Sequence, residues 1–161
     1  MKKLLLIRHA KSSWKDESIK DFDRPLIKRG KYDSPRMADK LLRKGFTFDL
    51  IVSSSSKRTS DTAKIFADIL GFNSKIVFED KLYLASYSEI LEIINGIEER
   101  YRSVIVVCHN PGITDLANYL NDLFIENIPT TGIVGLAFDG SWKDLGYKSC
   151  KMLFFDYPKK F

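Results

Sequence analysis

Residues 4–9 read Leu-Leu-Leu-Ile-Arg-His, an unbroken apolar run that ends in a cationic and an ionisable side chain. A short run without polar alternation is typical of a strand buried on both faces of a parallel sheet. Residues 50–52 (Leu-Ile-Val) and residues 104–108 (Val-Ile-Val-Val-Cys) repeat the pattern. These runs predict a covered, largely parallel sheet.

Helical patterns separate the apolar runs. One helix is expected to open at Ser34-Pro35 and to end at Gly45, because proline suits the first position of a helix. Further helices are expected over residues 57–70, from Ser86 or Ser88 to about residue 97, and from about Thr114 to residue 120. Alternating strands and helices are typical of an α/β fold.

Two more strand segments complete the predicted sheet. Residues 75–78 read as a strand, and residues 133–138 pair with 147–155 as a hairpin. We therefore expect a three-layer α/β/α sandwich whose mostly parallel sheet has an antiparallel edge. The length of 161 residues, with 44% hydrophobic and 29% charged residues, indicates a single domain spanning residues 1–161.

Charge and cysteine content narrow the class of protein. The net charge of +5 comes from mixed runs along the chain and no basic stripe, so nucleic-acid binding is not expected; only residues 158–161 resemble a basic tail. Two cysteines without C-x-x-C spacing favour a reducing cytoplasm. The first apolar run is too short for a secretory signal, and no run is long enough to span a membrane.

Candidate catalytic residues follow the predicted strands. Arg8 and His9 follow the first, Arg58 lies after the serine-rich segment that follows the second, and His109 with Asn110 follows the third. Ligands of open α/β sheets bind at the carboxyl ends of the strands, so we expect these side chains to converge. A lone histidine or arginine at a strand end is more often structural or solvated. Together, two guanidinium groups and two imidazoles suit a phosphoryl dianion, and an imidazole facing a clamped phosphorus can attack it.

No cofactor is expected. The chain has only His9 and His109, which excludes a three-histidine metal site, and no metal-ligand cluster is seen.

Several motifs resemble one known family. They include residues 5–14 with the Arg-His pair, Asp-Arg-Pro-Leu at 23–26, the serine-rich segment with Arg58, Leu-Tyr-Leu-Ala at 82–85, and Cys-His-Asn-Pro at 108–111. In this order they resemble the histidine phosphatase (phosphoglycerate-mutase-like) superfamily, and within it the small branch of SixA-type phosphohistidine phosphatases. The resemblance covers nearly the whole chain.

The resemblance implies roles for individual residues. His9 matches the nucleophile that becomes phosphorylated, and Arg8 and Arg58 match the arginines that bind phosphoryl oxygens. His109 matches the histidine that hydrogen-bonds the transferred group. Arg24, Ser12 and Asn110 are expected on the substrate side of the pocket, although a structural salt bridge for Arg24 and a capping role for Ser12 are equally open.

The chain departs from the family pattern at two positions. Ala10 stands where most relatives have glycine, which is a small change. Leu84 stands where larger relatives have an acidic proton donor, and Glu79, Asp80 and Glu89 are expected to be surface charges. A phosphorylated imidazole can be protonated on its own ring, whereas an alkoxide needs an acid. The missing acid therefore favours phosphohistidine as substrate.

The sequence thus predicts a metal-independent phosphatase that forms a covalent intermediate on His9 and acts on phosphohistidine in a protein. A protein substrate is favoured because the chain has little length to spare for a lid over the pocket. Two alternatives stay open: a phosphomonoesterase of small phosphate esters, and a phospho-recognition module without catalysis.

Residues 15–23 are expected to be a surface loop.

Overall fold

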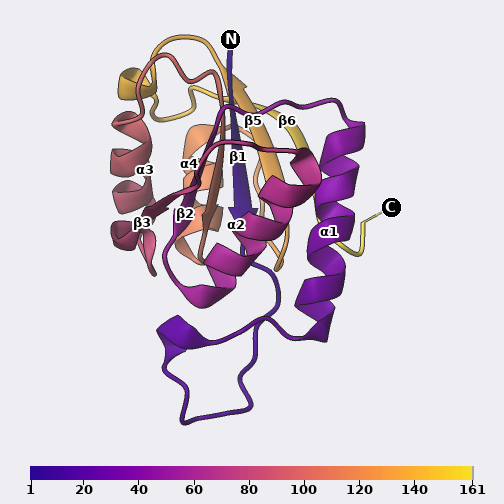
Figure 1. Cartoon of the computed structure of the whole chain (residues 1–161). Helices are drawn as coiled ribbons and strands as arrows, with labels where there is room; N and C mark the ends of the chain where they lie inside the picture. The colour runs from indigo at the N-terminus through magenta and orange to yellow at the C-terminus, as the bar shows by residue number, and fades with distance from the viewer. Residues whose placement is uncertain (161) are drawn as a thin grey trace.

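A computed structural model gives the fold (Figure 1) and describes residues 1–160; Phe161, the last residue of the expected basic tail, lies outside the described residues. The strands within this range are β1 (Lys2–Arg8), β2 (Leu50–Ser54), β3 (Val77–Glu79), β4 (Ser103–Cys108), β5 (Ile133–Phe138) and β6 (Lys151–Asp156). The α-helices are α1 (Lys28–Arg43), α2 (Lys57–Leu70), α3 (Tyr87–Asn95) and α4 (Gly112–Leu120). Short 3-10 helices are η1 (Asp21–Asp23), η2 (Asp80–Leu82) and η3 (Trp142–Asp144).

The strands form one mixed sheet in the order β3-β2-β4-β1-β5-β6. Strands β3, β2, β4 and β1 are parallel, and β5 is antiparallel to both β1 and β6. This confirms the predicted parallel sheet with an antiparallel edge. Strands β1 and β4 are neighbours in register, with Arg8 opposite Cys108, so the residues that follow them emerge side by side.

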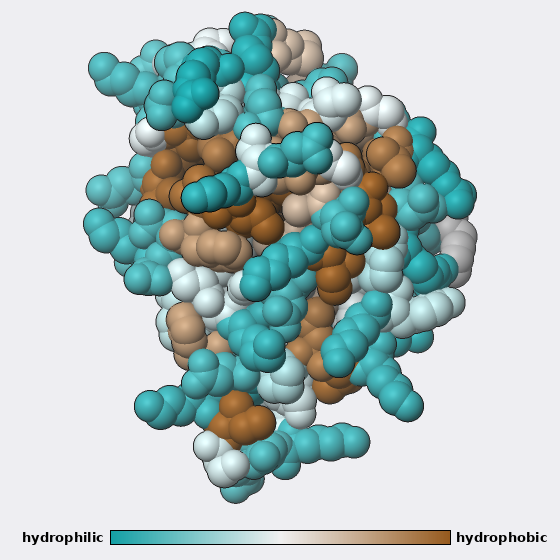
Figure 2. Space-filling view, viewed as in Figure 1, coloured by the Kyte–Doolittle hydropathy of each residue, from teal (hydrophilic) through white to brown (hydrophobic). Residues whose placement is uncertain are grey.

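Two hydrophobic clusters fill the spaces above and below the sheet. Alternate residues of the central strands face opposite sides, so Leu5 and Ile7 pack with α1 and α2, whereas Leu4 and Leu6 pack with α3 and α4. Helices α1 and α2 therefore cover one face and α3 and α4 the other, which confirms the three-layer architecture. Hydrophilic side chains cover much of the outer surface on the side of α1 and α2, with hydrophobic areas between them (Figure 2).

The start of α1 differs from the sequence prediction. The helix begins at Lys28, and Pro35 lies inside it although proline was expected at its first position. Gly30 explains why the helix extends toward the N-terminus: a Cβ there would come within 2.3 Å of the main-chain oxygen of Lys11. Close packing on the segment after β1 thus holds the first turns, and Pro35 is accommodated despite the main-chain hydrogen bond that it cannot donate.

Other predicted elements are confirmed with shifted ends. Helix α2 has the predicted bounds, and Ser86 caps α3 through a reciprocal pair of hydrogen bonds with Glu89. Strand β6 begins at Lys151, later than the expected residue 147, because residues 147–148 form a turn. No helix among residues 1–160 has the length and apolar character needed to cross a membrane.

Candidate active site

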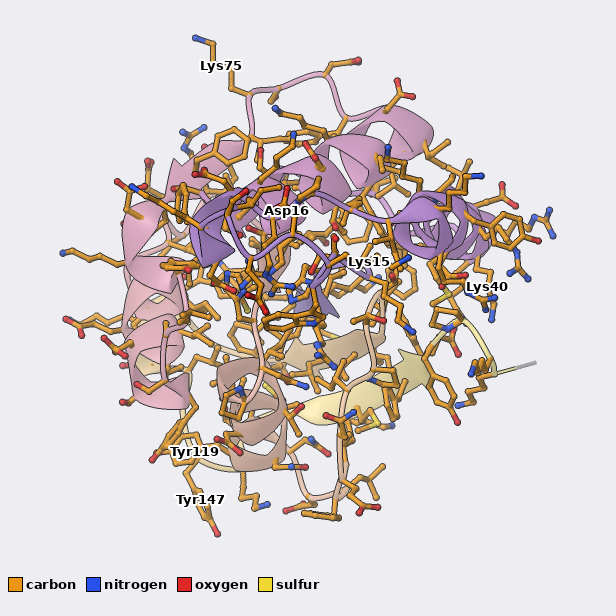
Figure 3. The ribbon with its side chains drawn as sticks, turned by 90° about the horizontal axis from the view of Figure 1, so that it is seen from below. Lys15, Asp16, Lys40, Lys75, Tyr119 and Tyr147 are labelled. Atoms are coloured by element: carbon orange, nitrogen blue, oxygen red, sulfur yellow. The ribbon has the colours of Figure 1, made fainter. Side chains whose placement is uncertain are left out.

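A cavity of about 480 Å³ opens at the carboxyl ends of β1, β2 and β4. The loop that follows β1 extends from this end of the molecule (Figure 1), and from below Lys15 and Asp16 lie in front of the strand ends (Figure 3). The residues that line the cavity are Arg8, His9, Lys11, Ser12, Trp14, Asp21, Arg24, Arg58, Leu84, His109, Asn110 and Thr130. Every site residue predicted from the sequence is among them.

We call Arg8, His9, Arg58 and His109 the floor of the cavity. His9, Arg58 and His109 are 8%, 2% and 2% exposed. We call Trp14 and Leu84 the rim, since each lines the cavity and is more than half exposed.

His9 has a defined tautomer. Its Nδ1 lies 2.8 Å from the main-chain oxygen of Ala10, and a carbonyl oxygen can only accept a hydrogen bond. Nδ1 therefore carries the proton of the neutral ring, and the lone pair of Nε2 is free. Burial, together with the charges of Arg58, Arg8 and Arg24, lowers the pKa of His9 to about 3, against the hydrogen bond to Ala10 that raises it. The ring is neutral at physiological pH, which keeps Nε2 nucleophilic.

His109 has the opposite tautomer. Its Nε2 lies 2.8 Å from Ser54 Oγ, and its Nδ1 accepts a 3.4 Å hydrogen bond from Arg58, which can only donate. Nε2 therefore carries the proton and donates to Ser54. The rings of His9 and His109 lie with centroids 5.4 Å apart. The two strands thus bring together imidazoles that differ in which nitrogen is free.

Arg8 and Arg58 point their guanidinium groups to the same place from different elements. Arg8 ends β1 and donates to the main-chain oxygen of Ile128 at 3.0 Å. Arg58 is the second residue of α2, whose N-terminal peptide dipoles favour a negative charge. The Nε atoms of both arginines are buried without a hydrogen-bond partner. A buried donor without a partner costs free energy, and both guanidinium groups line the cavity in which an anion would bind.

The pKa shifts of the floor residues indicate that the protein supplies little negative charge to the cavity. Burial and the neighbouring Arg58 lower the pKa of Arg8. The pKa of His109 falls to about 3, first through burial and then through the electrostatic repulsion of His9 and Arg58, with Asp21 opposing the shift. All of these shifts disfavour positive charge. A phosphoryl dianion would reverse them, since an opposite charge within a few ångströms favours the charged form of a base.

Arg24 lies beside the floor and is held from several sides. It donates to Ser12 Oγ at 2.9 Å and to the main-chain oxygen of Ser13 at 3.0 Å, and Trp14 stacks on its guanidinium group with 3.5 Å from Cζ to the ring centroid. The hydroxyl of Ser12 therefore supports Arg24, and neither side chain is a surface group. The salt bridge that the sequence left open for Arg24 exists, with Asp21.

Asn110 lines the cavity, but its side chain contacts the protein. Its amide nitrogen donates to Asn127 Oδ1 at 2.8 Å and to the main-chain oxygen of Ile128 at 3.1 Å, and its amide oxygen accepts from Thr114 at 2.7 Å. These contacts fix the loop that passes beside Arg8. A direct contact between Asn110 and a substrate stays a prediction.

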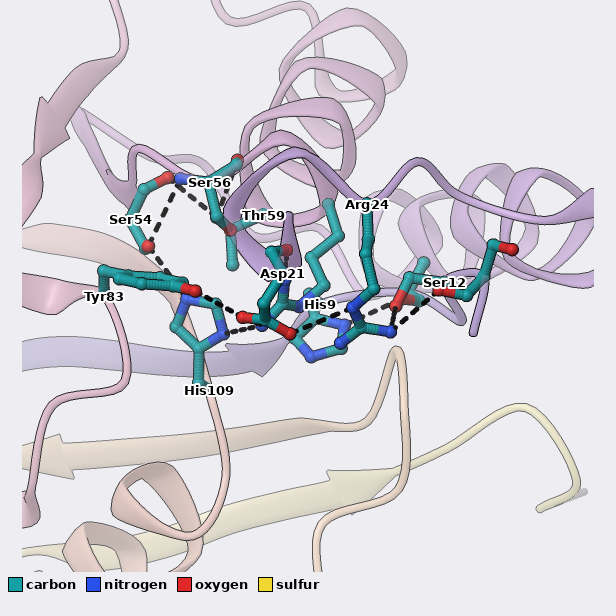
Figure 4. Close-up of polar contacts among 12 residues, drawn as sticks. His9, Ser12, Asp21, Arg24, Ser54, Ser56, Thr59, Tyr83 and His109 are labelled. Carbon is teal, nitrogen blue, oxygen red and sulfur yellow. Dashed lines mark hydrogen bonds and ion pairs between the residues drawn. The ribbon is translucent and has the colours of Figure 1, made fainter. Parts of the chain in front are cut away.

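Sequence reasoning assigned no role to three polar residues of the site, which are Asp21, Ser54 and Tyr83. Asp21, in the segment expected to be a surface loop, accepts hydrogen bonds from Arg58, Arg24 and Tyr83 (Figure 4). Ser54 orients His109 from the end of β2. Asp21 lies three residues before Arg24, a spacing that two residues of many surface loops share, so it did not single out Asp21.

The position expected to carry an acid is on the cavity wall and is apolar. Leu84 lines the cavity, is 56% exposed and has a φ of +51°, which is uncommon for a residue with a side chain. Glu79, Asp80 and Glu89 line a different depression, so their prediction as charges outside the site is confirmed. Asp21 is the one carboxylate among the described residues that line the cavity. Within residues 1–160, no three His, Cys, Asp or Glu side chains gather in a group that could hold a metal ion.

The chain is similar to known proteins over most of its length. Residues 4–90 match the model of the histidine phosphatase superfamily (branch 1). An uncharacterised chloroplastic protein of Arabidopsis thaliana is 32% identical over 152 residues, which are 89% of this chain and 70% of that protein. A crystal structure from Agrobacterium tumefaciens, of a protein named as phosphohistidine phosphatase SixA, is 26% identical with a TM-score of 0.85 and covers 98% of both chains. The protein histidine phosphatase SixA in complex with tungstate shares the fold, with 19% identity, a TM-score of 0.84 and 97% of both chains covered.

Proposed function

The chain belongs to the histidine phosphatase superfamily, and from this premise we propose that it is a phosphatase that carries the phosphoryl group on His9 Nε2 during turnover. The observation that supports this most is the hydrogen bond from His9 Nδ1 to Ala10, because it leaves Nε2 unprotonated in a cavity lined by Arg8, Arg24 and Arg58. A binding module would need the arginines but not a histidine held in that tautomer.

The arginines of the floor would bind the phosphoryl oxygens. Their guanidinium groups and the N-terminus of α2 supply donors and positive charge at one place. The dianion would raise the pKa of His109, so that Nδ1 gains a proton and donates to the phosphoryl group while Nε2 keeps its contact with Ser54. Groups fixed before the reaction stabilise the transition state most effectively.

Two displacements would complete the reaction. In the first, the lone pair of His9 Nε2 forms a bond to phosphorus as the bond from phosphorus to the leaving group breaks. In the second, water forms a P–O bond, the P–N bond breaks, its electron pair returns to Nε2, and the protons of water go to the phosphate product and solvent. Donors from Arg8, Arg58 and His109 face the phosphoryl group in both steps.

We infer that the substrate is phosphohistidine in a protein. Leu84 cannot donate a proton, and an imidazole leaving group takes its proton on its own ring, whereas an ester oxygen would need an acid. The exposed rim is also accessible to a side chain on a folded partner: Trp14 is 77% and Leu84 is 56% exposed. The name of the protein from Agrobacterium tumefaciens supports the same substrate class.

We place the reaction in a reducing compartment such as the cytoplasm, because Cys108 and Cys150 are both free thiols. We also propose that the guanidinium groups supply the positive charge that a metal ion supplies in other phosphatases.

Replacing His9 with alanine tests the covalent step. The variant should lose hydrolysis of a phosphohistidine protein, of phosphoramidate and of p-nitrophenyl phosphate, and should form no acid-labile phosphoenzyme. His109→Asn is the matched control: turnover should fall, but the label on His9 should still form and be lost in acid. Full turnover by His9→Ala would refute the mechanism. Relative kcat/KM on the three substrates separates a phosphohistidine phosphatase from a phosphomonoesterase of small esters.

A further inference from the structure

Asp21 is the one group of the cavity that bridges two of its arginines. Its Oδ1 accepts from Arg24 Nε at 3.0 Å, and its Oδ2 accepts from a terminal nitrogen of Arg58 at 3.1 Å. The other terminal nitrogen of Arg58 donates to the main-chain oxygen of Asp21 at 2.7 Å, and the hydroxyl of Tyr83 donates to Oδ2. Figure 4 shows Asp21 between Tyr83 and Arg24. Asp21 thus contacts both ends of the terminal fork of Arg58.

The protonation state of Asp21 excludes it as the missing acid. Burial opposes its ionisation, but the hydrogen bonds from Tyr83 and Arg58 and the charge of Arg58 outweigh this and lower the pKa of Asp21 to about 2. At neutral pH it is a carboxylate without a proton to donate.

Asp21 contacts Arg58 only through its terminal nitrogens. The terminal nitrogens of Arg58 contact Asp21 and His109, whereas its buried Nε has no partner. Asp21 accepts from both terminal nitrogens of Arg58, through its main-chain oxygen and its carboxylate, so it fixes the orientation of the guanidinium group.

Building on the proposed function, we propose that Asp21 is a positioning residue: anchored by Tyr83, it holds the guanidinium groups of Arg58 and Arg24 in the orientation that receives the phosphoryl group. Bidentate contacts of arginine depend on orientation as well as charge. Segment 15–23 therefore supplies part of the catalytic geometry.

Asp21→Asn tests this role because it keeps the shape and removes the charge. Without the carboxylate the cavity is more positive, so inorganic phosphate should bind at least as tightly as in the wild type. The loosened Arg58 should nevertheless lower kcat on phosphoramidate by about 10- to 100-fold, by analogy with the loss seen when a group that orients a metal-ligating side chain is removed. Tyr83→Phe should lower kcat in the same direction by a smaller factor. Asp16→Asn, in the same loop and in contact with Ser18, is the matched control and should change neither quantity.

Calorimetric titration with inorganic phosphate and kcat measurements separate the outcomes. A lower kcat without weaker phosphate binding supports positioning. An unchanged or higher kcat with tighter binding would make Asp21 a competitor of substrate and overturn the proposal. A joint fall of kcat, phosphate binding and melting temperature would show a merely structural role and also overturn it. No turnover by the wild type would refute the proposed function itself, and with it the role of Asp21.

Discussion

The floor and the rim of the cavity differ in burial. The buried floor is suited to act on the phosphoryl group, and the exposed rim is suited to distinguish one substrate from another. On the floor, His9, Arg58 and His109 are nearly excluded from water, which lowers the pKa of both histidines and leaves guanidinium donors without partners. On the rim, Trp14 and Leu84 keep most of their surface exposed. Buried charges act strongly on a bound phosphoryl group because little solvent screens them, whereas exposed apolar groups act only on what contacts them. Changes on the floor should therefore affect every substrate, and changes on the rim should discriminate among them.

The largest effect in this comparison is expected from Arg58→Ala. Removing a hydrogen-bond donor that faces the negative charge developing in the transition state raises the activation free energy by about 2.7–4 kcal/mol. We therefore expect kcat/KM to fall by about 100- to 1,000-fold. The loss should be similar for a phosphohistidine protein and for phosphoramidate, since both present the same phosphoryl group. Steady-state kinetics on both substrates measures it. Lys57→Ala, at the exposed preceding position of α2, is the control and should retain activity. A loss confined to one substrate would contradict the assignment of Arg58 to the floor.

Stability should depend on pH through the two floor histidines. Their pKa values are about 3 in the folded protein and about 6.5 in the unfolded chain. Between these values the unfolded chain binds protons that the folded protein does not, so stability is complete above pH ~6.5 and falls as the pH drops toward 3. Lowering the pH from about 7.5 to about 5.5 should cost about 1.4 kcal/mol per histidine.

Urea unfolding in a buffer free of phosphate and sulfate measures this pH dependence. The double variant His9→Gln, His109→Gln should lose most of it. Equal unfolding free energies for the wild type at both pH values would show that the histidines are not held neutral by the floor.

A smaller effect is expected from Trp14→Ala on the rim. Exposed tryptophans at an interface commonly contribute about 1 kcal/mol or more to binding a protein partner. The ratio of kcat/KM for a phosphohistidine protein to that for phosphoramidate should therefore fall about fivefold. Phe124→Ala is the matched control, because Phe124 is 81% exposed and does not line the cavity. If Trp14→Ala leaves this ratio of kcat/KM values unchanged, the rim does not discriminate between the two substrates, and the comparison of rim and floor is wrong.

Removing metal ions should have the smallest effect. If the guanidinium groups of the floor supply the positive charge, incubation with EDTA followed by gel filtration should leave kcat unchanged on phosphoramidate. Loss of activity that a divalent cation restores would show that the floor is incomplete without a metal ion.

Much of the fold was predictable because burial leaves a direct trace in the sequence. Strands β1, β2 and β4 are buried on both faces, so each reads as an unbroken apolar run. The start of α1 was not predictable from its own residues. Pro35 is a favourable first residue, and only the close contact between Gly30 and Lys11 shows why the helix begins earlier.

Some residues of the candidate site could likewise be predicted from the sequence, and others could not. Arg8, His9, Arg58 and His109 could be placed from the sequence, because parallel strands direct their carboxyl ends to one edge and each residue follows a recognisable strand or begins a helix. Asp21 could not, because a charged residue in a polar loop has the same local pattern whether it is solvated or bound to two arginines. Its role depends on contacts with residues 37 and 62 positions away.

The sequence by itself determined the sheet, the edge at which its histidines and arginines meet, and the absence of an acid at position 84, since each follows from the order of apolar and polar residues along the chain. Only the tertiary structure decided which nitrogen of each histidine is free, that the Nε atoms of Arg8 and Arg58 lack partners, and that Asp21 holds the guanidinium groups. The physical reason is that tautomers, pKa values and arginine orientation are set by hydrogen bonds and burial among side chains distant in sequence, and residue order encodes those contacts only through the fold.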